Sequence, residues 1–472
     1  MTQATNKQKS HPTIGSRALV IGGSMAGLLA ARVLTEHFDR VSIVESDLLP
    51  EDPETRPGVP QGNHVHVLLT QGKQIFEGLF PGLEAELAAA GAPLMDWGAE
   101  CPWFGWWGWY PRFASNLNTR LCSRQLLESL IRSRLQRDGK VQFLERTKVT
   151  DLLADSSGSR VTGIKARSAS GEERIEADFV VDASGRNSAL PNWLASLGYE
   201  KPAESVVNSF LGYGSRWYEI PEGFQADWKV VVLWPRPPYS KRGGVIYSVE
   251  GNRWVLTLTG VAKDYPPTDE AAFLEFARSL RHPILYDPIK NARPLSPVYA
   301  YRRTENCWRH YEKLSKLPEG LVALGDAVCS FNPVYGQGMT AAALGAIALG
   351  DSLRQQHPSM EGFPQFFYRR LARVNSAPWL MATGEDLRWE GTEGAKPDFI
   401  ARLMHRYLDS VLLLGTERPQ VWEHFLKVIH MVEPPTSLFR PGILTQVLRQ
   451  ATVRSKPSEP ACLEQSVPEF NG

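Results

Sequence analysis

The chain has 472 residues, of which 43% are hydrophobic and 22% charged, so it is long enough for several globular domains and too apolar for disorder. Its 52 basic and 51 acidic residues give a formal net charge of +1, which offers no overall electrostatic case for a nucleic-acid partner. The five cysteines are widely spaced without a CxxC pair, which excludes an evident disulfide framework or zinc site and favours a cytoplasmic location. No apolar run reaches the roughly 18 residues that a membrane span needs.

The first ordered segment is predicted to be a strand, a turn and a helix. After a polar tail (1–15), residues 17–21 form a short apolar run typical of a buried parallel strand. A glycine-containing turn follows at 22–27, and 28–34 is predicted to be a helix packed on the sheet. A second strand at 41–45 completes a β-turn-α-β unit within about 30 residues, as a dinucleotide-binding unit requires.

The rest of the chain alternates between strand and helix patterns. Residues 48–62 carry four prolines and are predicted to be a loop. Helices are predicted at 65–87 with a break at Pro81-Gly82, at 123–137 with Ser123 as N-cap, at 271–280, at 339–354, and over most of 363–450 with breaks at Pro378, Pro397, Pro419 and Pro434-Pro435. Strands are predicted at 141–153, 163–169, 177–182, 228–233, 244–250, 253–259 and 320–326, those of 206–261 forming a mostly antiparallel sheet.

The turn Gly22-x-Ser24-x-x-Gly27 has the spacing of a dinucleotide-binding turn. Gly22 permits a tight turn, Gly27 lets the helix sit close to the strand, and a small residue at Ser24, beside Met25, lets backbone amides reach a pyrophosphate. Glu45 ends the second strand 18 residues after Gly27. A carboxylate there accepts from ribose hydroxyls and repels a 2′-phosphate, so the nucleotide is predicted to be FAD or NAD.

A second glycine-containing turn, far along the chain, favours FAD over NAD. Gly325-Asp326 follows a predicted strand, and Gly336, Gly338 and Met339 stand at the start of a predicted helix. An NAD site needs no such element, whereas the flavin end of FAD lies well away from its adenine end. Amides at this helix start are expected to hold the ring edge that is negative in reduced flavin, with Asp326 accepting from ribityl hydroxyls.

These motifs occur in the order found in a known family. Gly22-x-Ser24-x-x-Gly27, Glu45, Asp178-Phe-Val-Val-Asp182-Ala-Ser-Gly185 and Gly325-Asp326 together resemble the FAD-dependent monooxygenases of the p-hydroxybenzoate hydroxylase fold, over roughly residues 17 to 355. Within that family, Pro60-Gln-Gly-Asn-His-Val-His66 is most similar to bacterial flavin epoxidases that act on polyene or polyketide chains.

The resemblance implies roles for further residues. Arg124 is expected to contact the FAD phosphate or ribityl region, and the backbones of Gly58 and Met339 to pass near the FAD. Asp182 corresponds to a motif linked to both FAD and the reduced nicotinamide. The sequence reads Asp-Ala-Ser-Gly here and not the Asp-Gly form of aromatic hydroxylases, which leaves open whether NADH or NADPH reduces the flavin directly or through a flavin reductase.

The fold class follows from the pattern of elements: α/β, with a Rossmann-like FAD-binding domain, an inserted antiparallel β-sheet substrate domain and a C-terminal helical region. The expected division is a tail (1–15), a discontinuous FAD-binding domain (16–95, 120–200 and 300–360), a substrate domain (96–119 and 201–299), a helical region (361–452) and a second tail (453–472).

Two groups of side chains remain open to more than one interpretation. Trp107, Trp109, Phe331 and Tyr335 are candidates for the wall of an apolar substrate pocket, with plain packing as the alternative. His64 and His66 are spaced i, i+2, which suits neither a helical pair nor one strand face. We expect them to shape the flavin environment, with a metal ligand pair, a covalent flavin anchor or a general base as the alternatives, and assign them no metal.

The resemblance implies an oxidoreductase that transfers one oxygen atom from O₂, through a flavin C4a-hydroperoxide, to an apolar, electron-rich substrate. Epoxidation or hydroxylation of a polyene, polyketide, terpenoid or aromatic compound of secondary metabolism fits this chemistry. No catalytic acid or base is assigned, because the cofactor carries the chemistry. The alternatives are a reductase of the geranylgeranyl type, a flavin halogenase, for which Lys73 is the candidate lysine, and a non-catalytic flavin-binding protein.

Overall fold

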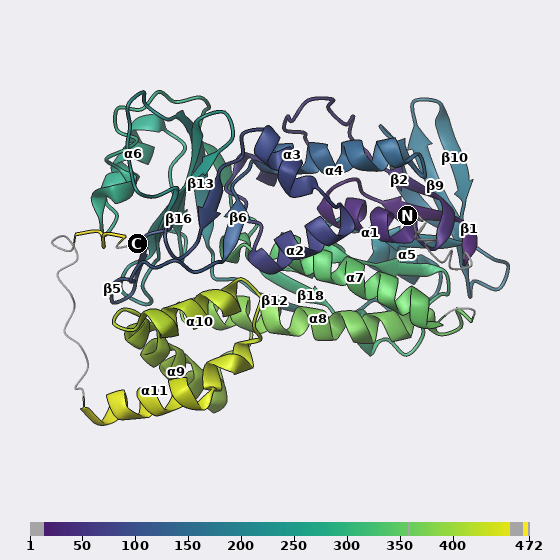
Figure 1. Ribbon diagram of the computed structural model, residues 1–472. Helices are drawn as coiled ribbons and strands as arrows, with labels where there is room; N and C mark the ends of the chain where they lie inside the picture. The colour runs from purple at the N-terminus through teal and green to yellow at the C-terminus, as the bar shows by residue number, and fades with distance from the viewer. Residues whose placement is uncertain (1–13, 357–358, 454–465, 471–472) are drawn as a thin grey trace, which may run out of the picture.

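The computed structural model describes residues 14–356, 359–453 and 466–470. One part of the molecule is built on a five-stranded parallel sheet with the order β19–β11–β1–β2–β7, at the right of Figure 1. Its strands are β1 (Gly15–Ile21), β2 (Phe38–Val44), β7 (Val141–Leu144), β11 (Phe179–Asp182) and β19 (Leu321–Ala323). Since β11 pairs with both β1 and β19, strands that are far apart in the sequence lie side by side in this sheet.

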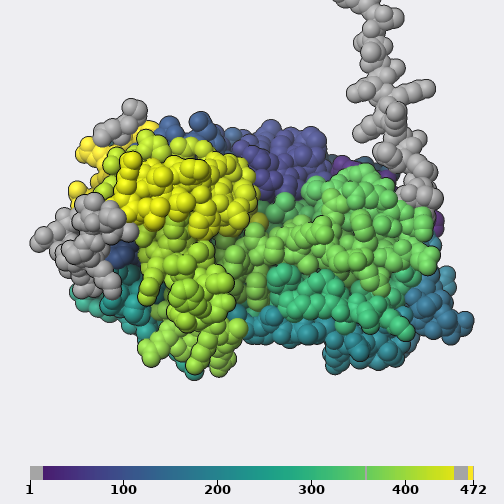
Figure 2. Space-filling model, turned by 90° about the horizontal axis from the view of Figure 1, so that it is seen from below, coloured from purple at the N-terminus to yellow at the C-terminus, as the bar shows by residue number. Residues whose placement is uncertain are grey.

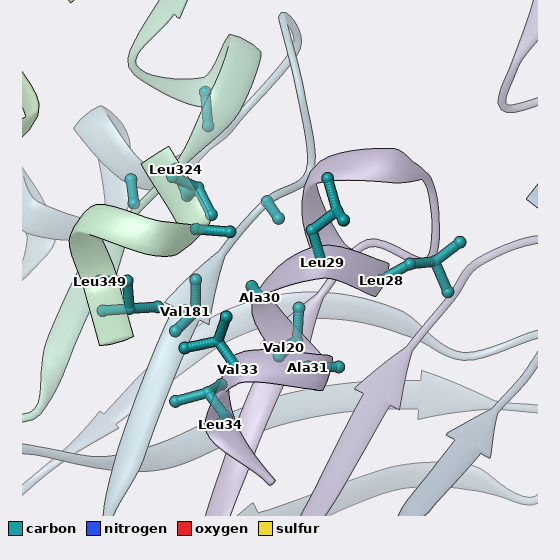
Figure 3. Close-up of a cluster of buried hydrophobic side chains, with 14 of the residues drawn as sticks. Val20, Leu28, Leu29, Ala30, Ala31, Val33, Leu34, Val181, Leu324 and Leu349 are labelled. Atoms are coloured by element: carbon teal, nitrogen blue, oxygen red, sulfur yellow. The ribbon is translucent and has the colours of Figure 1, made fainter. Parts of the chain in front are cut away.

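Two helices rich in small residues pack beside each other on this sheet, α1 (Met25–Leu34) and α7 (Gly338–Gln356). Figure 3 shows Leu29 of α1, Val181 of β11 and Leu349 of α7 in one buried cluster. The close approach depends on missing side chains, because a Cβ on Gly350 of α7 would lie 2.7 Å from Val33 Cγ1 of α1. The helix predicted at 339–354 is confirmed as α7.

A seven-stranded sheet with the order β17–β13–β16–β15–β14–β4–β5 forms the second β part. Its strands are β4 (Trp103–Gly105), β5 (Gly108–Trp109), β13 (Gly212–Glu219), β14 (Val230–Leu233), β15 (Arg242–Val249), β16 (Arg253–Gly260) and β17 (Tyr299–Tyr301). All pairs are antiparallel except β4 with β14, which confirms the predicted mostly antiparallel sheet. Helix α6 (Glu270–Arg278) covers one face through Phe273 and Phe276.

The remaining strands form three small sheets. They are β3 (Leu94–Asp96) with β6 (Asn118–Arg120), β8 (Lys148–Ala154) with β9 (Val161–Ser168) and β10 (Gly171–Glu176), and β12 (Glu204–Val207) with β18 (Asn306–Arg309) and β20 (Cys329–Ser330). The shorter helices are α2 (Thr70–Leu79), α3 (Leu83–Ala89), α4 (Arg124–Asp138) and α5 (Leu190–Ser196). Ser123 caps α4 as predicted, since its side chain accepts a hydrogen bond from Leu126 N.

Four helices complete the chain: α8 (Phe363–Asp386), α9 (Phe399–Gly415), α10 (Pro419–Ile429) and α11 (Pro441–Val453). Figure 2 shows them in green to yellow across one face, with the last three helices at the left of the view, and α8 packs beside α7. The Trp422 ring of α10 stacks on Tyr110 with ring centroids 3.6 Å apart, so the C-terminal helices dock on the aromatic-rich segment 103–110. None of the helices within the described residues has the length and apolar character of a membrane span.

Two local predictions were wrong, for reasons of tertiary structure. Residues 65–69 have no regular secondary structure and are not helical, because Val65 N donates to Thr257 Oγ1 (3.2 Å) and ties this stretch to the seven-stranded sheet. Pro378 does not break the chain but lies inside α8. The cost of an internal proline, about 3 kcal/mol, is outweighed here by packing of α8 against α7. Most of the predicted tails, 1–13, 454–465 and 471–472, lies outside the described residues.

Candidate functional site

The motif residues meet at one edge of the parallel sheet. Gly22 follows β1, Glu45 follows β2, Asp182 ends β11, and Gly325 comes just after β19. All four strands are parallel, so their carboxyl ends share this edge, where open α/β sheets bind ligands. A Cβ on Gly325 would lie only 2.7 Å from the Ala26 Cβ in the first turn of α1. The opening turn and the Gly325-Asp326 turn are therefore in direct contact.

The opening turn has the backbone geometry that its glycines predict. Gly22 has φ +101°, and a Cβ there would meet the Ala183 carbonyl oxygen at 2.7 Å. A Cβ on Gly27 would lie 1.8 Å from the Gly22 carbonyl oxygen, so only glycine lets α1 start this close to the strand. Ser24 makes no side-chain cap, which leaves the first-turn amides of α1 free for a ligand. Met25 is buried as the first residue of the helix.

Glu45 lies beside this turn and is 6% exposed. Its Oε2 accepts a hydrogen bond from Gly23 N (2.8 Å) and lies 3.1 Å from Arg56 Nη1. Asp47, two residues on, accepts from Gly58 N (2.7 Å) and from Arg56 (2.8 Å). The loop that carries Gly58 is thus tied to the end of β2, and the contact of the Gly58 backbone with FAD stays a prediction.

Arg124 and Ser24 belong to a buried charged network at the start of α1. Arg124 Nη2 donates to Ser24 Oγ (2.7 Å), and Ser24 Oγ donates to Glu128 Oε2 (2.9 Å). Arg56 Nε donates to the other oxygen of Glu128 (3.1 Å). Burial opposes ionisation of Glu128, but Arg124 and Arg56 hold its pKa below the ordinary value.

This network fits a dinucleotide that carries a pyrophosphate. The buried Nη2 of Arg56 has no hydrogen-bond partner within the described residues. A cavity lined by Arg56, Arg124, Arg132 and Glu128 adjoins it. Free helix amides, an unpaired guanidinium donor and the strand-end carboxylate of Glu45 supply donors for phosphate and an acceptor for ribose.

Sequence reasoning missed Arg56 and Glu128. Arg56 stands in the proline-rich loop, where no pattern marks it, and Glu128 follows Arg124 at i+4 on α4, which is the only local signal of their pairing.

The two aspartates of the later motifs differ in their surroundings. Asp182 is fully buried, and its Oδ1 accepts from Ser184 N (3.0 Å) and Ser184 Oγ (2.6 Å), so it shapes the turn after β11. Burial raises its pKa. Asp326 is exposed, yet the protein around it raises the pKa of its carboxyl against the pull of Arg186 and Arg124. Asp326 is therefore accessible to a ligand and lies within electrostatic range of both arginines.

The turn before α7 contains Gly336 and leads to Gly338 at the start of the helix. Gly336 has φ +68°, and a Cβ there would lie 3.5 Å from Val67 Cβ, in the non-helical stretch that borders the seven-stranded sheet. Gly338 begins α7, and a Cβ on it would meet nothing within 4 Å, so the backbone is open to a ligand. Met339 follows as a buried residue of the first turn.

The two histidines lie between this turn and the seven-stranded sheet. His64 Nδ1 is 2.7 Å from Ser215 Oγ, and His66 Nδ1 is 3.1 Å from the His64 carbonyl oxygen. Burial lowers the pKa of His64 to about 3 and that of His66 to about 4, so both are neutral near pH 7. Within the described residues no cluster of His, Cys, Asp or Glu could hold a metal ion.

The four aromatic candidates lie in different places. Trp109 packs against Phe104 and His282 in a core of the second β part, which is the packing alternative. Trp107 lies 4.8 Å from the Arg236 guanidinium. Phe331 is buried in the core of the first part, and Tyr335 lies in the turn before α7. The structure does not gather them into one wall.

With this geometry established, comparison with known proteins decides the family. The family model described as "FAD binding domain" matches residues 112–356. The chain belongs to this family. Protein Rv3254 of Mycobacterium tuberculosis is 36% identical over 81% of each chain, and a kynurenine 3-monooxygenase of Salinispora arenicola is 25% identical over 72% of this chain and 73% of that one. A flavin-dependent brominase, Bmp2, has the same fold with a TM-score of 0.66 at 15% identity, covering 93% of this chain and 99% of that one.

The protein is thus an FAD-dependent member of the p-hydroxybenzoate hydroxylase-type monooxygenases. The predicted fold class is confirmed: an α/β FAD-binding domain, a second sheet and a C-terminal helical region. The individual cofactor contacts of Gly22, Glu45, Arg124 and Asp326 stay predictions, which their convergence at one edge supports.

Proposed function

We propose that the protein transfers one oxygen atom from O₂ to an apolar, electron-rich substrate such as a polyene, polyketide, terpenoid or aromatic natural product. NADH or NADPH would supply electrons, directly or through a flavin reductase. The contact between the opening turn and the Gly325-Asp326 turn supports this proposal, because one extended FAD molecule would then lie against both.

Bound FAD supplies the activation of O₂, and the chain supplies binding, orientation and exclusion of water. The stretch 64–67 separates the turn at Gly336 from a cluster of aromatic side chains. This cluster joins the seven-stranded sheet to α9 and α10 and includes Trp103, Trp106, Trp217, Tyr299, Trp422 and Phe425. Such surroundings favour a large apolar molecule and keep water away from the reacting atoms.

The surroundings of Lys73 do not support the halogenase alternative. That chemistry needs a lysine between flavin and substrate. The Lys73 ammonium instead donates to the Asn118 carbonyl oxygen (3.1 Å) and lies 3.3 Å from Glu84 on α3. The brominase resemblance rests on fold alone, at 15% identity.

The decisive experiment uses the purified holoprotein, NADH or NADPH, a flavin reductase, ¹⁸O₂ and a panel of apolar substrates. We expect one ¹⁸O atom in the product, counted by mass spectrometry. Reduction of a substrate double bond without oxygen consumption would identify a reductase instead. A protein that does not bind FAD would refute the proposal at its first step.

A further inference from the structure

A buried carboxylate links the turn before α7 to the C-terminal helical region. Asp386 is the last residue of α8 and is 1% exposed. Its carboxylate accepts hydrogen bonds from Asn306 Nδ2 (2.6 Å), from Asn332 Nδ2 (3.1 Å to each oxygen) and from the Tyr335 hydroxyl (2.8 Å). All three donors are neutral, so none of them cancels the charge of the carboxylate.

These bonds hold both ends of the turn 332–335. Because the Asn332 amide nitrogen donates to Asp386, its oxygen faces inward and accepts from Val334 N (3.3 Å), which caps the turn. At the other end, the Tyr335 hydroxyl is fixed on the same carboxylate. Gly336 follows at once with a left-handed backbone, and α7 begins two residues later. By holding Asn332 and Tyr335, Asp386 therefore helps to fix where the backbone amides of 336–338 lie.

The contacts of Asp386 suit its ionised form, which accepts from all three donors at once. A carboxylate accepts all three donors, whereas a carboxylic acid would direct its own proton at one of them. Burial raises the pKa of Asp386 to about 6, so the group is mostly ionised at neutral pH. A negative charge paired only with neutral donors then lies behind the turn, where low polarity lets its field reach further than in water.

We propose that Asp386 is a positioning residue for the flavin: it holds the turn 332–338 against the ring, and its charge makes reduction of the ring less favourable. This inference rests on the proposed function, since it takes the turn to border the flavin. Reduced flavin carries negative charge, which a nearby carboxylate disfavours. The C-terminal helical region, outside the matched residues 112–356, thereby takes part in tuning the cofactor.

The test compares Asp386→Asn with the wild-type protein. Glu385→Gln is the matched control, because Glu385 is the adjacent carboxylate and its charge, which also acts on Tyr335, is offset by Arg388 (3.1 Å). The dissociation constant of FAD is measured by fluorescence titration of each apoprotein, and the reduction potential of the bound flavin by equilibration with a reference dye. We expect Asp386→Asn to weaken FAD binding at least tenfold and to shift the potential to a more positive value. Glu385→Gln should stay within twofold of the wild type.

A second variant separates position from charge. Tyr335→Phe removes one hydrogen bond and leaves the carboxylate, so FAD should bind several-fold more weakly with an unchanged potential. Wild-type affinity and potential in a folded Asp386→Asn variant would overturn the inference. If that variant does not fold, wild-type affinity in Tyr335→Phe would overturn it. A wild-type protein that binds no FAD would instead refute the proposed function, so the two failures are distinguishable.

Discussion

Replacing Gly27 by alanine is the sharpest perturbation that the structure offers. The added Cβ would lie 1.8 Å from the Gly22 carbonyl oxygen and 3.3 Å from Val20 Cγ1, whereas Cβ atoms essentially never approach other atoms more closely than 3.0 Å. The contact is thus about 1.2 Å too short, and no side-chain rotation can relieve it, because the obstacle is a backbone carbonyl oxygen. Gly22 is itself fixed by its bond to the Val44 carbonyl oxygen (2.9 Å) and by its left-handed backbone.

The start of α1 must therefore move away from the sheet. Overpacking a core costs about 1–3 kcal/mol, and a contact with backbone belongs at the upper end, so we expect a loss of about 3 kcal/mol of unfolding free energy. The displaced first turn also misaligns the amides that face the ligand. A tenfold weaker affinity corresponds to about 1.4 kcal/mol, and we expect at least that loss for FAD.

Gly78→Ala is the matched control. Gly78 also lies in a helix, α2, and a Cβ there would meet nothing within 4 Å, so this variant should be neutral or more stable by up to about 1 kcal/mol. Urea denaturation of the apoproteins measures stability, and flavin absorbance per protein measures FAD content. Wild-type stability and full flavin content in Gly27→Ala would refute the close approach of α1 to β1.

Three further predictions concern stability, packing and the reaction. Burial lowers the pKa of His64 and His430 to about 3 and of His66 to about 4, from an ordinary 6.5, so the unfolded chain binds protons that the folded chain refuses. Below pH 6.5, the free energy of unfolding should therefore decrease by about 1.4 kcal/mol per pH unit for each histidine. Urea titrations of His430→Gln should show a shallower dependence of this free energy on pH. An unchanged dependence would contradict the assignment. Trp109→Ala should cost about 3–5 kcal/mol and retain FAD, as chemical denaturation and absorbance will show; lost substrate binding at wild-type stability would return Trp109 to a pocket wall. Lys73→Ala should leave ¹⁸O incorporation unchanged, and loss of incorporation in a folded, FAD-loaded variant would show that Lys73 takes part in the reaction.

Local patterns were sufficient where function demands a special backbone. Gly22 and Gly27 predict a tight turn and a close helix, and the structure has both because no other residue fits there. The side chain of Ser123 likewise predicts the start of α4, since the cap is a bond within three residues. The non-helical stretch 65–69 was missed because its partner, Thr257, lies far along the chain.

The sequence by itself determined the order of the dinucleotide-binding motifs and the FAD-dependent class, because each motif is a local requirement of backbone geometry or hydrogen bonding. Only the tertiary structure decided which charged and polar side chains face one another. Arg56 with Glu128, and Asp386 with Asn306 and Tyr335, are joined across long stretches of chain by burial. Such pairs leave no periodic trace in the sequence, since they depend on which elements the fold brings together, where the attraction between the partners offsets the cost of removing both from water.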